Sequence, residues 1–263
     1  MSADRLVRQT RTIAPFEAIV LGASGTFPKP GGATSGFLLR VGKFTVWMDC
    51  GTGTFANLQR HTDYRDLSAV VISHLHLDHF LDFYPFYYAL RYGKDSPGPN
   101  GLEVYAPAGA EEHLTKLVSP TSAEGFGGYF DFNPVRSGDK IAVPPFVFTF
   151  RRTVHPIETL AVRVEANGRS LVYTADTAWS EELIDFAQGA NVLVAEATLQ
   201  EPDPAGSKVH MTAEEAGRMA HDARASRLVL THLAPGLDPT VSMDQAAKYF
   251  RGKILVATDN LNI

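Results

Sequence analysis

The chain has very little cysteine and no long hydrophobic run. A single Cys among 263 residues cannot form an intrachain disulfide, which excludes a disulfide scaffold and suits a reducing compartment. No stretch approaches the roughly 18 apolar residues of a membrane span, and the apolar run at 18–21 is too short for a signal peptide. We therefore expect a cytoplasmic protein with no membrane partner.

The chain also lacks an excess of positive charge. It has 24 Lys and Arg against 29 Asp and Glu, a net charge of −5, so it has no overall field that attracts nucleic acid. Repeats, low-complexity tracts and Pro- or Ser-rich linkers are missing, and we expect one domain over residues 1–263. With 44% hydrophobic and 20% charged residues, the composition is that of a globular protein with a large core.

Many short apolar strands come first, and helices mix with them in the second half. Asn167-Gly168 is a strong hairpin-turn signal, and Thr212 with Glu215 fits a capping box. Because strands and helices intermix, the fold class is α/β or α+β. We expect strands at 16–22, 37–41, 45–49, 70–72, 102–106, 146–154, 160–164, 170–174, 191–195, 227–231 and 254–257, and helices at 85–92, 110–117, 181–188, 213–224 and 243–251.

Histidine, in contrast, is plentiful, with nine residues. The segment 73–79 reads Ser-His-Leu-His-Leu-Asp-His and directly follows the buried strand 70–72. His74 and His76 alternate by two at the strand end, so both rings project to one side, while Asp78 and His79 approach after the chain turns. This arrangement suits two metal ions side by side. A solvated His-rich loop is the alternative, but four such groups would be costly to place beside a buried strand.

With these residues the sequence resembles the metallo-β-lactamase fold hydrolases over nearly its whole length. His155 closes a strand as the family's third ligand segment does, and 173–177 is similar to the aspartate segment, with Ala175 where Gly is more usual. His232 lies in a segment like the last His segment, and 49–53 is similar to the Asp-x-Gly-x-Gly turn. The resemblance implies a four-layer αβ/βα sandwich of two mixed sheets flanked by helices.

Carried over residue by residue, the resemblance implies two divalent metal ions bridged by one carboxylate. The ligands contain no thiolate, which suits Zn²⁺ best and also Mn²⁺ or Fe²⁺. One metal would be held by His74, His76 and His155, the other by Asp78, His79 and His232, with Asp176 bridging the two.

The nearby Cys50, Asp49 and Asp82 have other expected roles. Cys50 is interpreted as a small buried residue, and Asp49 as an acceptor that orients a ligand His or, alternatively, only stabilises its turn. Asp82 is a weaker candidate for the orienting role. The three remaining histidines, His61, His113 and His221, have no partner pattern and are expected on the surface.

Two further segments resemble the ribonuclease Z-like phosphodiesterase branch. Residues 194–198 match its Glu-Ala-Thr segment, and 210–213 its His-Ser-Thr-Ala segment. Two metals would activate water and stabilise charge on phosphorus. His210, held by Glu196, would then protonate the leaving alkoxide as general acid, and Asp78 completes the catalytic candidates. Alternatively, His210 caps the helix that begins near Thr212, and Glu196 is a strand-end charge. His76 stands where the flavodiiron branch has Glu, which disfavours an oxygen-reducing di-iron site.

The spacing between two of the candidate ligands limits the class of substrate that we expect. Long ribonuclease Z enzymes insert a tRNA-gripping arm between the third His and the Asp segments, but only 21 positions separate His155 from Asp176 here. We therefore expect a small phosphodiester, such as a cyclic nucleotide, and not tRNA. Lactonase or thioesterase chemistry, ribonuclease Z-like RNA processing and a non-catalytic binding module stay open as alternatives. Relatives of this branch are often dimers, which suggests a homodimer by analogy.

Two loops are candidates for bordering the site, 22–36 and 125–129. Aromatic side chains in or near the second could stack on a base or simply belong to the core. These are Tyr87, Phe126, Tyr129 and Phe130.

Overall fold

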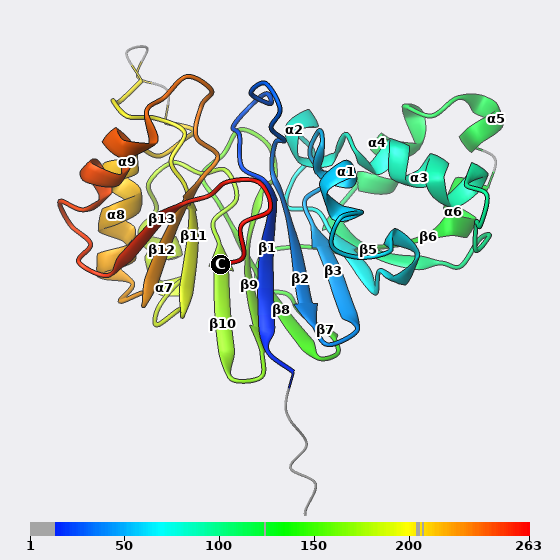
Figure 1. Ribbon diagram of the computed structural model, residues 1–263, viewed down its shortest axis with the longest axis horizontal. Coiled ribbons are helices and arrows are strands. Elements are labelled where there is room, and N and C mark those ends of the chain that lie inside the picture. The colour runs from blue at the N-terminus through cyan, green and yellow to red at the C-terminus, as the bar shows by residue number, and fades with distance from the viewer. Residues whose placement is uncertain (1–13, 124, 204–205, 207) are drawn as a thin grey trace, which may run out of the picture.

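Two mixed sheets organise the computed structural model, which describes residues 14–123, 125–203, 206 and 208–263 (Figure 1). The first sheet has the order β1-β2-β3-β4-β5-β6 and the second β13-β12-β11-β10-β9-β8-β7. The first comprises β1 (Phe16–Gly22), β2 (Gly36–Val41), β3 (Phe44–Met48), β4 (Ala69–Val71), β5 (Leu102–Pro107) and β6 (Phe130–Val135). The second comprises β7 (Lys140–Val143), β8 (Phe146–Arg152), β9 (Leu160–Ala166), β10 (Arg169–Tyr173), β11 (Val192–Glu196), β12 (Arg227–Thr231) and β13 (Lys253–Val256).

Helices flank both sheets. Among the described residues, no helix is long and apolar enough to cross a membrane. The first group comprises α1 (Thr54–Leu58), the 3₁₀ helix η1 (Tyr64–Asp66), α2 (Leu77–Phe80), α3 (Phe83–Tyr92), α4 (Ala110–Lys116), α5 (Pro120–Ala123) and α6 (Phe126–Tyr129). The second group comprises α7 (Glu181–Phe186), α8 (Ala213–Asp222) and α9 (Pro239–Ala246).

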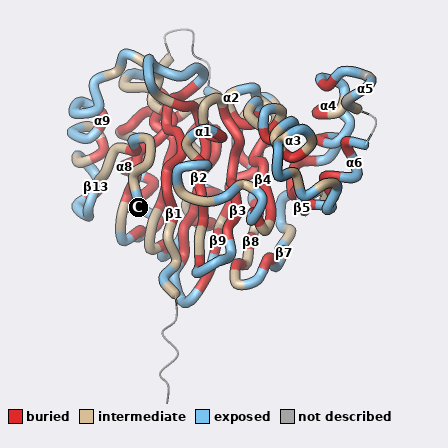
Figure 2. Tube along the Cα trace, turned by 45° about the vertical axis from the view of Figure 1, so that its right-hand side comes forward, coloured by how far each residue is buried: buried red, intermediate tan, exposed pale blue. Residues whose placement is uncertain are grey.

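Strand alternation divides the buried side chains into three layers of core. The central layer holds inward-facing residues of both sheets, such as Val20 and Leu39 from the first and Phe148 and Val162 from the second. The outer layers lie between each sheet and its helices. Buried segments accordingly run along the strands, with exposed segments on the helices and turns (Figure 2). The four-layer αβ/βα sandwich predicted from the sequence is confirmed.

Most predicted elements are present with small changes at their ends. The Asn167-Gly168 turn has positive φ at both residues, 50° and 73°, as a tight hairpin requires. Thr212 and Glu215 form the predicted capping box. The predicted helix 243–251 is wrong in its bounds, because α9 begins at Pro239, after the Asp238 carboxylate caps it by accepting from the Thr240 N–H. The strands β6 and β7 and the short helices α1, α2, α5 and α6 were not predicted.

The aromatic residues proposed near the site belong instead to the core between the first sheet and its helices. Tyr87, Phe126, Tyr129 and Phe130 are all buried in that layer. The Tyr87 and Phe126 ring centroids are 4.9 Å apart, and Phe126 lies 5.2 Å from Phe130. Segment 125–129 contains helix α6 rather than a loop beside the site. None of the four is available to stack on a base.

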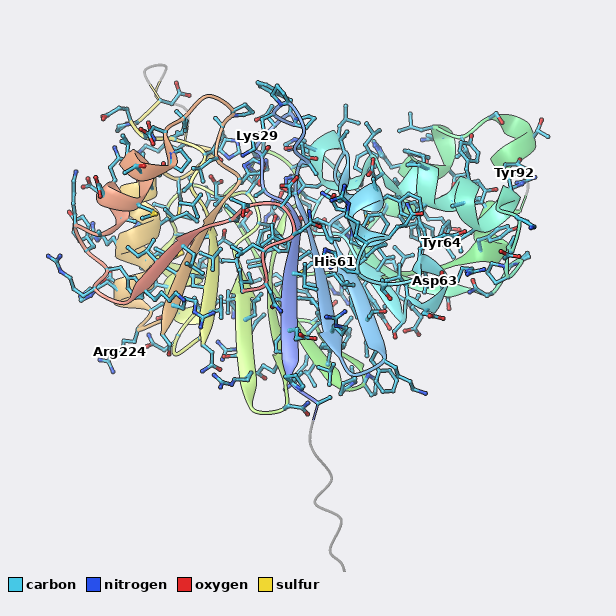
Figure 3. All side chains as sticks on the ribbon, viewed as in Figure 1. Lys29, His61, Asp63, Tyr64, Tyr92 and Arg224 are labelled. Atoms are coloured by element: carbon cyan, nitrogen blue, oxygen red, sulfur yellow. The ribbon has the colours of Figure 1, made fainter. Side chains whose placement is uncertain are left out.

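Replacement of Phe83 is expected to test this aromatic layer. Phe83 is fully buried and its ring lies 4.4 Å from that of Phe130, so Phe83→Ala removes a large apolar contact and leaves a cavity. We expect the free energy of unfolding in urea to fall by about 3–5 kcal/mol. The matched control is Tyr92→Ala at the exposed end of α3 (Figure 3), which should change it by less than about 0.5 kcal/mol. Equal losses would contradict the assignment.

Candidate metal centre

The predicted ligands meet at one edge of the two sheets, near the start of α2 (Figure 1). His74 and His76 follow β4, and Asp78 and His79 lie in the first turn of α2. The remaining three come from the second sheet, where each follows the end of a strand. His155 follows β8, Asp176 follows β10 and His232 follows β12.

The first group of ligand atoms contains three rings and one carboxylate. His76 Nδ1 lies 3.2 Å from His74 Nε2 and 3.1 Å from His155 Nε2. Asp176 Oδ2 is 3.6 Å from His74 Nε2 and 3.9 Å from His155 Nε2. All four ligand atoms lie within 4.8 Å of one another, so this group could hold one ion.

The second group lies on the other side of Asp176. His232 Nε2 is 3.1 Å from Asp78 Oδ2 and 3.4 Å from His79 Nε2. Asp176 Oδ1 lies 3.3 Å from His79 Nε2 and 3.5 Å from His232 Nε2. The two oxygens of Asp176 therefore face different groups, as a bridging carboxylate must.

The buried environment of these groups fits a metal cation. Asp176 is 2% exposed, and its Oδ1 accepts no well-aligned hydrogen bond from the described residues. A buried carboxylate oxygen left in that state is costly. Ring nitrogens from different histidines also point at one another, which is favourable only when their lone pairs share a cation or a proton.

The outer nitrogens of four rings are held by acceptors or hydroxyls, which fixes the rings and leaves the inner nitrogens free to bind metal. The partners are Ser73 Oγ for His74 Nδ1 at 3.0 Å, Asp49 Oδ2 for His79 Nδ1 at 2.8 Å, the Val209 carbonyl for His155 Nδ1 at 3.0 Å and Thr198 Oγ1 for His232 Nδ1 at 2.8 Å. Of these, only the role of Asp49 was predicted from the sequence.

Asp49 connects the two sheets behind the site. Its carboxylate accepts hydrogen bonds from the Ser73 backbone N–H and hydroxyl, the His79 ring and the Tyr173 hydroxyl. Its backbone has φ of 57°, a left-handed conformation that non-glycine residues adopt rarely and that clusters at functional sites. Ala175 and His232 share this conformation, at 49° and 57°. Asp49 orients His79, as predicted.

Asp82 does not share that role. It makes no hydrogen bond or ion pair with a described histidine, and its Oδ2 instead accepts from the Phe55 N–H at 2.8 Å. Gly53, the residue before α1, has no side chain to cap the helix. The Asp82 carboxylate therefore takes the place of a capping side chain and accepts a backbone N–H of the first turn of α1. The weaker prediction for Asp82 is wrong.

Asp49→Asn is expected to weaken zinc binding by about 10–100-fold. The new amide donates where the carboxylate accepts, so it opposes the donors from Ser73 and His79 and releases the His79 ring. Competition with a chromophoric chelator measures the affinity. Asp82→Asn is the matched control, since it changes a neighbouring half-buried carboxyl that makes no hydrogen bond or ion pair with a described histidine, and it should leave zinc affinity unchanged. An unaltered affinity in Asp49→Asn would contradict the orienting role.

His210 lies beside the two groups and is paired with Glu196. Its Nδ1 is 2.8 Å from Glu196 Oε1, and its ring centroid is 5.6 Å from that of His232. Burial lowers the pKa of His210, but the hydrogen bond and charge of Glu196, with the charges of Asp176 and Asp78, outweigh it and raise the pKa. Asp176, His210 and His232 also form a third group that could hold an ion.

Glu196 is fully buried at the end of β11 and holds several loops together. It accepts from the backbone N–H groups of Thr177, Thr198 and Met211 and from the Thr198 hydroxyl. The alternative that Glu196 is only a strand-end charge does not describe this position. Thr198 is a residue that sequence reasoning missed, although it completes the Glu-Ala-Thr segment. Its hydroxyl joins Glu196 to His232.

Zinc binding is expected to release protons. Burial lowers the pKa of His79 and His232, but the charge of Asp176 and hydrogen bonds to neighbouring carboxylates raise both pKa values above the usual range. Both rings therefore keep a proton at a pH where free imidazole has lost it, and a metal must displace that proton. Zinc affinity should fall as pH is lowered. Calorimetry in buffers of different ionisation enthalpy measures the release, and buffer-independent heats would contradict it.

The three remaining histidines and Cys50 belong to none of the groups of possible ligand atoms found among the described residues. His113 and His221 are exposed, as predicted, whereas His61 is half-buried and its Nε2 lies 2.7 Å from Asn260 Oδ1 (Figure 3). Cys50 is fully buried, and burial with the charges of Asp49 and Asp82 raises the pKa of its thiol well above the usual range. It stays a protonated thiol, as its predicted role requires.

The loop between β1 and β2 does border the site. The Thr26 N–H donates to Asp78 Oδ2 at 2.9 Å, and the Gly25 N–H donates to the carbonyl of Leu233, next to His232. A Cβ at Gly25 would lie 2.5 Å from the His232 carbonyl oxygen, so only glycine allows this close approach. The loop at 22–36 is confirmed as a wall of the site.

A family comparison agrees with this geometry. The model of the beta-lactamase superfamily domain matches residues 45–233. The chain belongs to the beta-lactamase superfamily. The matched region contains all seven predicted ligands, together with Glu196 and His210.

Several superfamily members are similar over nearly their full length. A probable metallo-hydrolase of Bacillus subtilis (strain 168), YhfI, is 33% identical over 244 residues, which covers 92% of this chain and 97% of the relative. Its crystal structure superimposes with a TM-score of 0.84, covering 95% and 99% of the two chains at 29% identity. Ribonuclease Z of Haloferax volcanii is 26% identical and covers 93% of each. The short form of human tRNase Z, at 22% identity and a TM-score of 0.72 over 94% and 98%, shows the shared fold.

Proposed function

We propose that this superfamily metallo-hydrolase is a dinuclear phosphodiesterase that hydrolyses a small phosphodiester, such as a cyclic nucleotide. The observation that carries the proposal is the His210–Glu196 pair at 2.8 Å, placed beside two groups of metal-binding atoms. Ester and thioester hydrolases of the superfamily share the His-rich core. A positioned proton donor is most useful where the leaving group is a poor one, such as a sugar alkoxide.

The residues present fit two zinc ions. His74, His76 and His155 would hold one and Asp78, His79 and His232 the other, with Asp176 shared. The donor set of imidazole and carboxylate suits Zn²⁺. When bound, the two ions supply an activated water and stabilise negative charge on phosphorus.

The chain's own residues supply the proton. Glu196 holds His210 through Nδ1, which leaves Nε2 to face the substrate. Because Glu196 favours the imidazolium form, His210 arrives protonated at the step in which the phosphorus–oxygen bond breaks. It then donates the Nε2 proton to the leaving oxygen, and Glu196 stabilises its charged state before that transfer.

A small substrate is supported by the segment between His155 and Asp176. All its residues are described. They form a short connection to β9 and then the antiparallel β9–β10 hairpin, with no additional arm. The net charge of −5 also provides no general attraction for a polyanion. A ribonuclease Z-like activity on RNA is the second candidate, favoured by the similarity to Haloferax volcanii ribonuclease Z.

A substrate panel tests the proposal. It compares bis-p-nitrophenyl phosphate, cyclic AMP, a precursor tRNA, homoserine lactone and S-lactoylglutathione at equal enzyme and zinc concentrations. We expect the highest kcat/KM among the small phosphodiesters. A preference for the lactone or thioester would replace phosphodiester chemistry with ester hydrolysis, and a preference for precursor tRNA would establish the second candidate.

A further inference from the structure

A cleft is lined by His210 and by side chains of α8 and α9. Its volume is about 660 Å³, within the range of small-molecule sites. Val154 and Ala178 line it, one residue before His155 and two after Asp176, so the cleft begins where the metal-binding edge ends. The seven proposed ligands lie outside its lining.

Arg218 lies over the ring of Trp179 in the wall of this cleft, and we call this stacked pair the Trp179–Arg218 platform. The Arg218 Cζ lies 4.9 Å from the centroid of the Trp179 ring. The half-buried indole packs against the core under α8, and an ion pair with Asp222 at 3.6 Å steadies the guanidinium. Indole rings and guanidinium planes are the surfaces on which nucleobases stack.

Several charged side chains of the cleft are engaged in ion pairs or in capping a helix. Lys248 contacts Glu214 at 2.7 Å, and Glu215 caps α8. Apart from His210, the lining contains three Lys and Arg residues, Lys208, Arg218 and Lys248, and four acids, Glu201, Asp203, Glu214 and Glu215. Such a lining has no surplus positive charge for a second phosphate or a nucleic-acid strand, and it suits an uncharged nucleoside.

We propose that this cleft binds the nucleoside part of the leaving group, with its base stacked on the Trp179–Arg218 platform. The inference rests on the proposed function and names the substrate class of that site. Water forms a new bond to phosphorus, the bond from phosphorus to the sugar oxygen breaks, and that oxygen takes the His210 proton. The leaving group must therefore lie on the His210 side, where the cleft begins. In a cyclic nucleotide, the sugar that carries the leaving oxygen also carries the base.

Kinetics with cyclic AMP on the zinc-loaded enzyme test the platform. Trp179→Leu should raise KM by about 10-fold or more while kcat stays within about threefold, because the metals and His210 are untouched. Trp179→Phe keeps an aromatic face and should restore KM to within about threefold of the wild type. Tyr249→Leu changes an exposed aromatic outside the cleft and should have no effect. An unchanged KM in Trp179→Leu would overturn the proposal.

Adenosine, which has no phosphate to hydrolyse, tests the same cleft without activity. The chain has two tryptophans, and Trp47 is fully buried in the core. A stacked base should therefore quench only the fluorescence of Trp179. We expect saturable quenching in the wild type and none in Trp179→Phe, whose remaining signal comes from Trp47. Absence of quenching in the wild type, or equal quenching in Trp179→Phe, would overturn the platform.

The two measurements test the nucleoside cleft and the proposed phosphodiesterase activity independently. Quenching of Trp179 by adenosine without hydrolysis of cyclic AMP would support the nucleoside cleft and reject the proposed function. Hydrolysis of cyclic AMP with no quenching and no change of KM in Trp179→Leu would support the function and reject the cleft.

Discussion

His210→Ala is expected to lower kcat for cyclic AMP by about 10²–10⁴-fold while zinc content stays unchanged. The sugar alkoxide is a poor leaving group, and His210, held at 2.8 Å by the Glu196 carboxylate, is the group positioned to protonate it. Steady-state kinetics give the rate, and elemental analysis of the same sample gives the metal content.

A substrate with a good leaving group serves as the control for His210→Ala. The p-nitrophenolate of bis-p-nitrophenyl phosphate needs little protonation, so its turnover should fall far less than that of cyclic AMP. The wild type should lose kcat for cyclic AMP at alkaline pH as the raised pKa of His210 is passed, and this limb should vanish in the variant. Normal turnover of cyclic AMP would reject the general-acid role.

Metal content decides between two roles for His210. Its position with Asp176 and His232 in a third possible group allows it to be a ligand instead of an acid. Loss of a metal in His210→Ala, with equal loss of activity on both substrates, would assign it as a ligand. Retention of metal with a selective loss on cyclic AMP would assign it as the acid.

Asp176→Ala is expected to remove at least one metal and to lower kcat by at least about 10³-fold. The two carboxylate oxygens face different groups, at 3.6 Å from His74 Nε2 and 3.3 Å from His79 Nε2. If Asp176 bridges two ions, removal of its side chain would leave each ion one ligand short and would leave their two positive charges without a shared anion. Elemental analysis of the dialysed protein is the measurement.

Asp139→Ala is the control for Asp176→Ala. Asp139 lies in the turn between β6 and β7, where it accepts from the Arg136 N–H, and it belongs to none of the groups of possible ligand atoms. It should keep full metal content and activity. Two metals per chain retained by Asp176→Ala would contradict the bridging role.

The gathering of the seven candidate ligands was predictable because each lies next to a strand end, in a segment that resembles a segment of the metallo-β-lactamase fold hydrolases. The alternation of His74 and His76 after a buried strand places both rings on one side, and the structure confirms this. The four-layer architecture was predictable only through the resemblance of these segments to the metallo-β-lactamase fold hydrolases, because the mixing of strands and helices alone indicates no more than an α/β or α+β class.

Apart from Asp49, the outer partners of the rings were not predicted from the sequence. Tyr173 reaches Asp49 across the two sheets, 124 positions along the chain, and the Val209 carbonyl reaches His155 across 54. Backbone carbonyls carry no sequence signal, and contacts between sheets depend on how the layers pack. Thr198 is the exception, because its place in the Glu-Ala-Thr segment could have indicated a role.

Of the two roles left open for the aromatic residues near segment 125–129, stacking on a base or packing in the core, the structure supports the core. Tyr87, Phe126, Tyr129 and Phe130 fill the core, because the helices on that side need bulky side chains to cover the sheet. Trp179, three positions after Asp176, lines the cleft instead. Its proximity in sequence to a ligand was the available signal.

A zinc titration of phosphodiesterase activity tests the central claim most directly. Metal-free protein is given increasing zinc, and kcat/KM for cyclic AMP is measured at each step. Two metals bridged by Asp176 predict little activity up to one equivalent per chain and a plateau at two. Full activity at one equivalent, or no hydrolysis of cyclic AMP at any zinc content, would contradict the account.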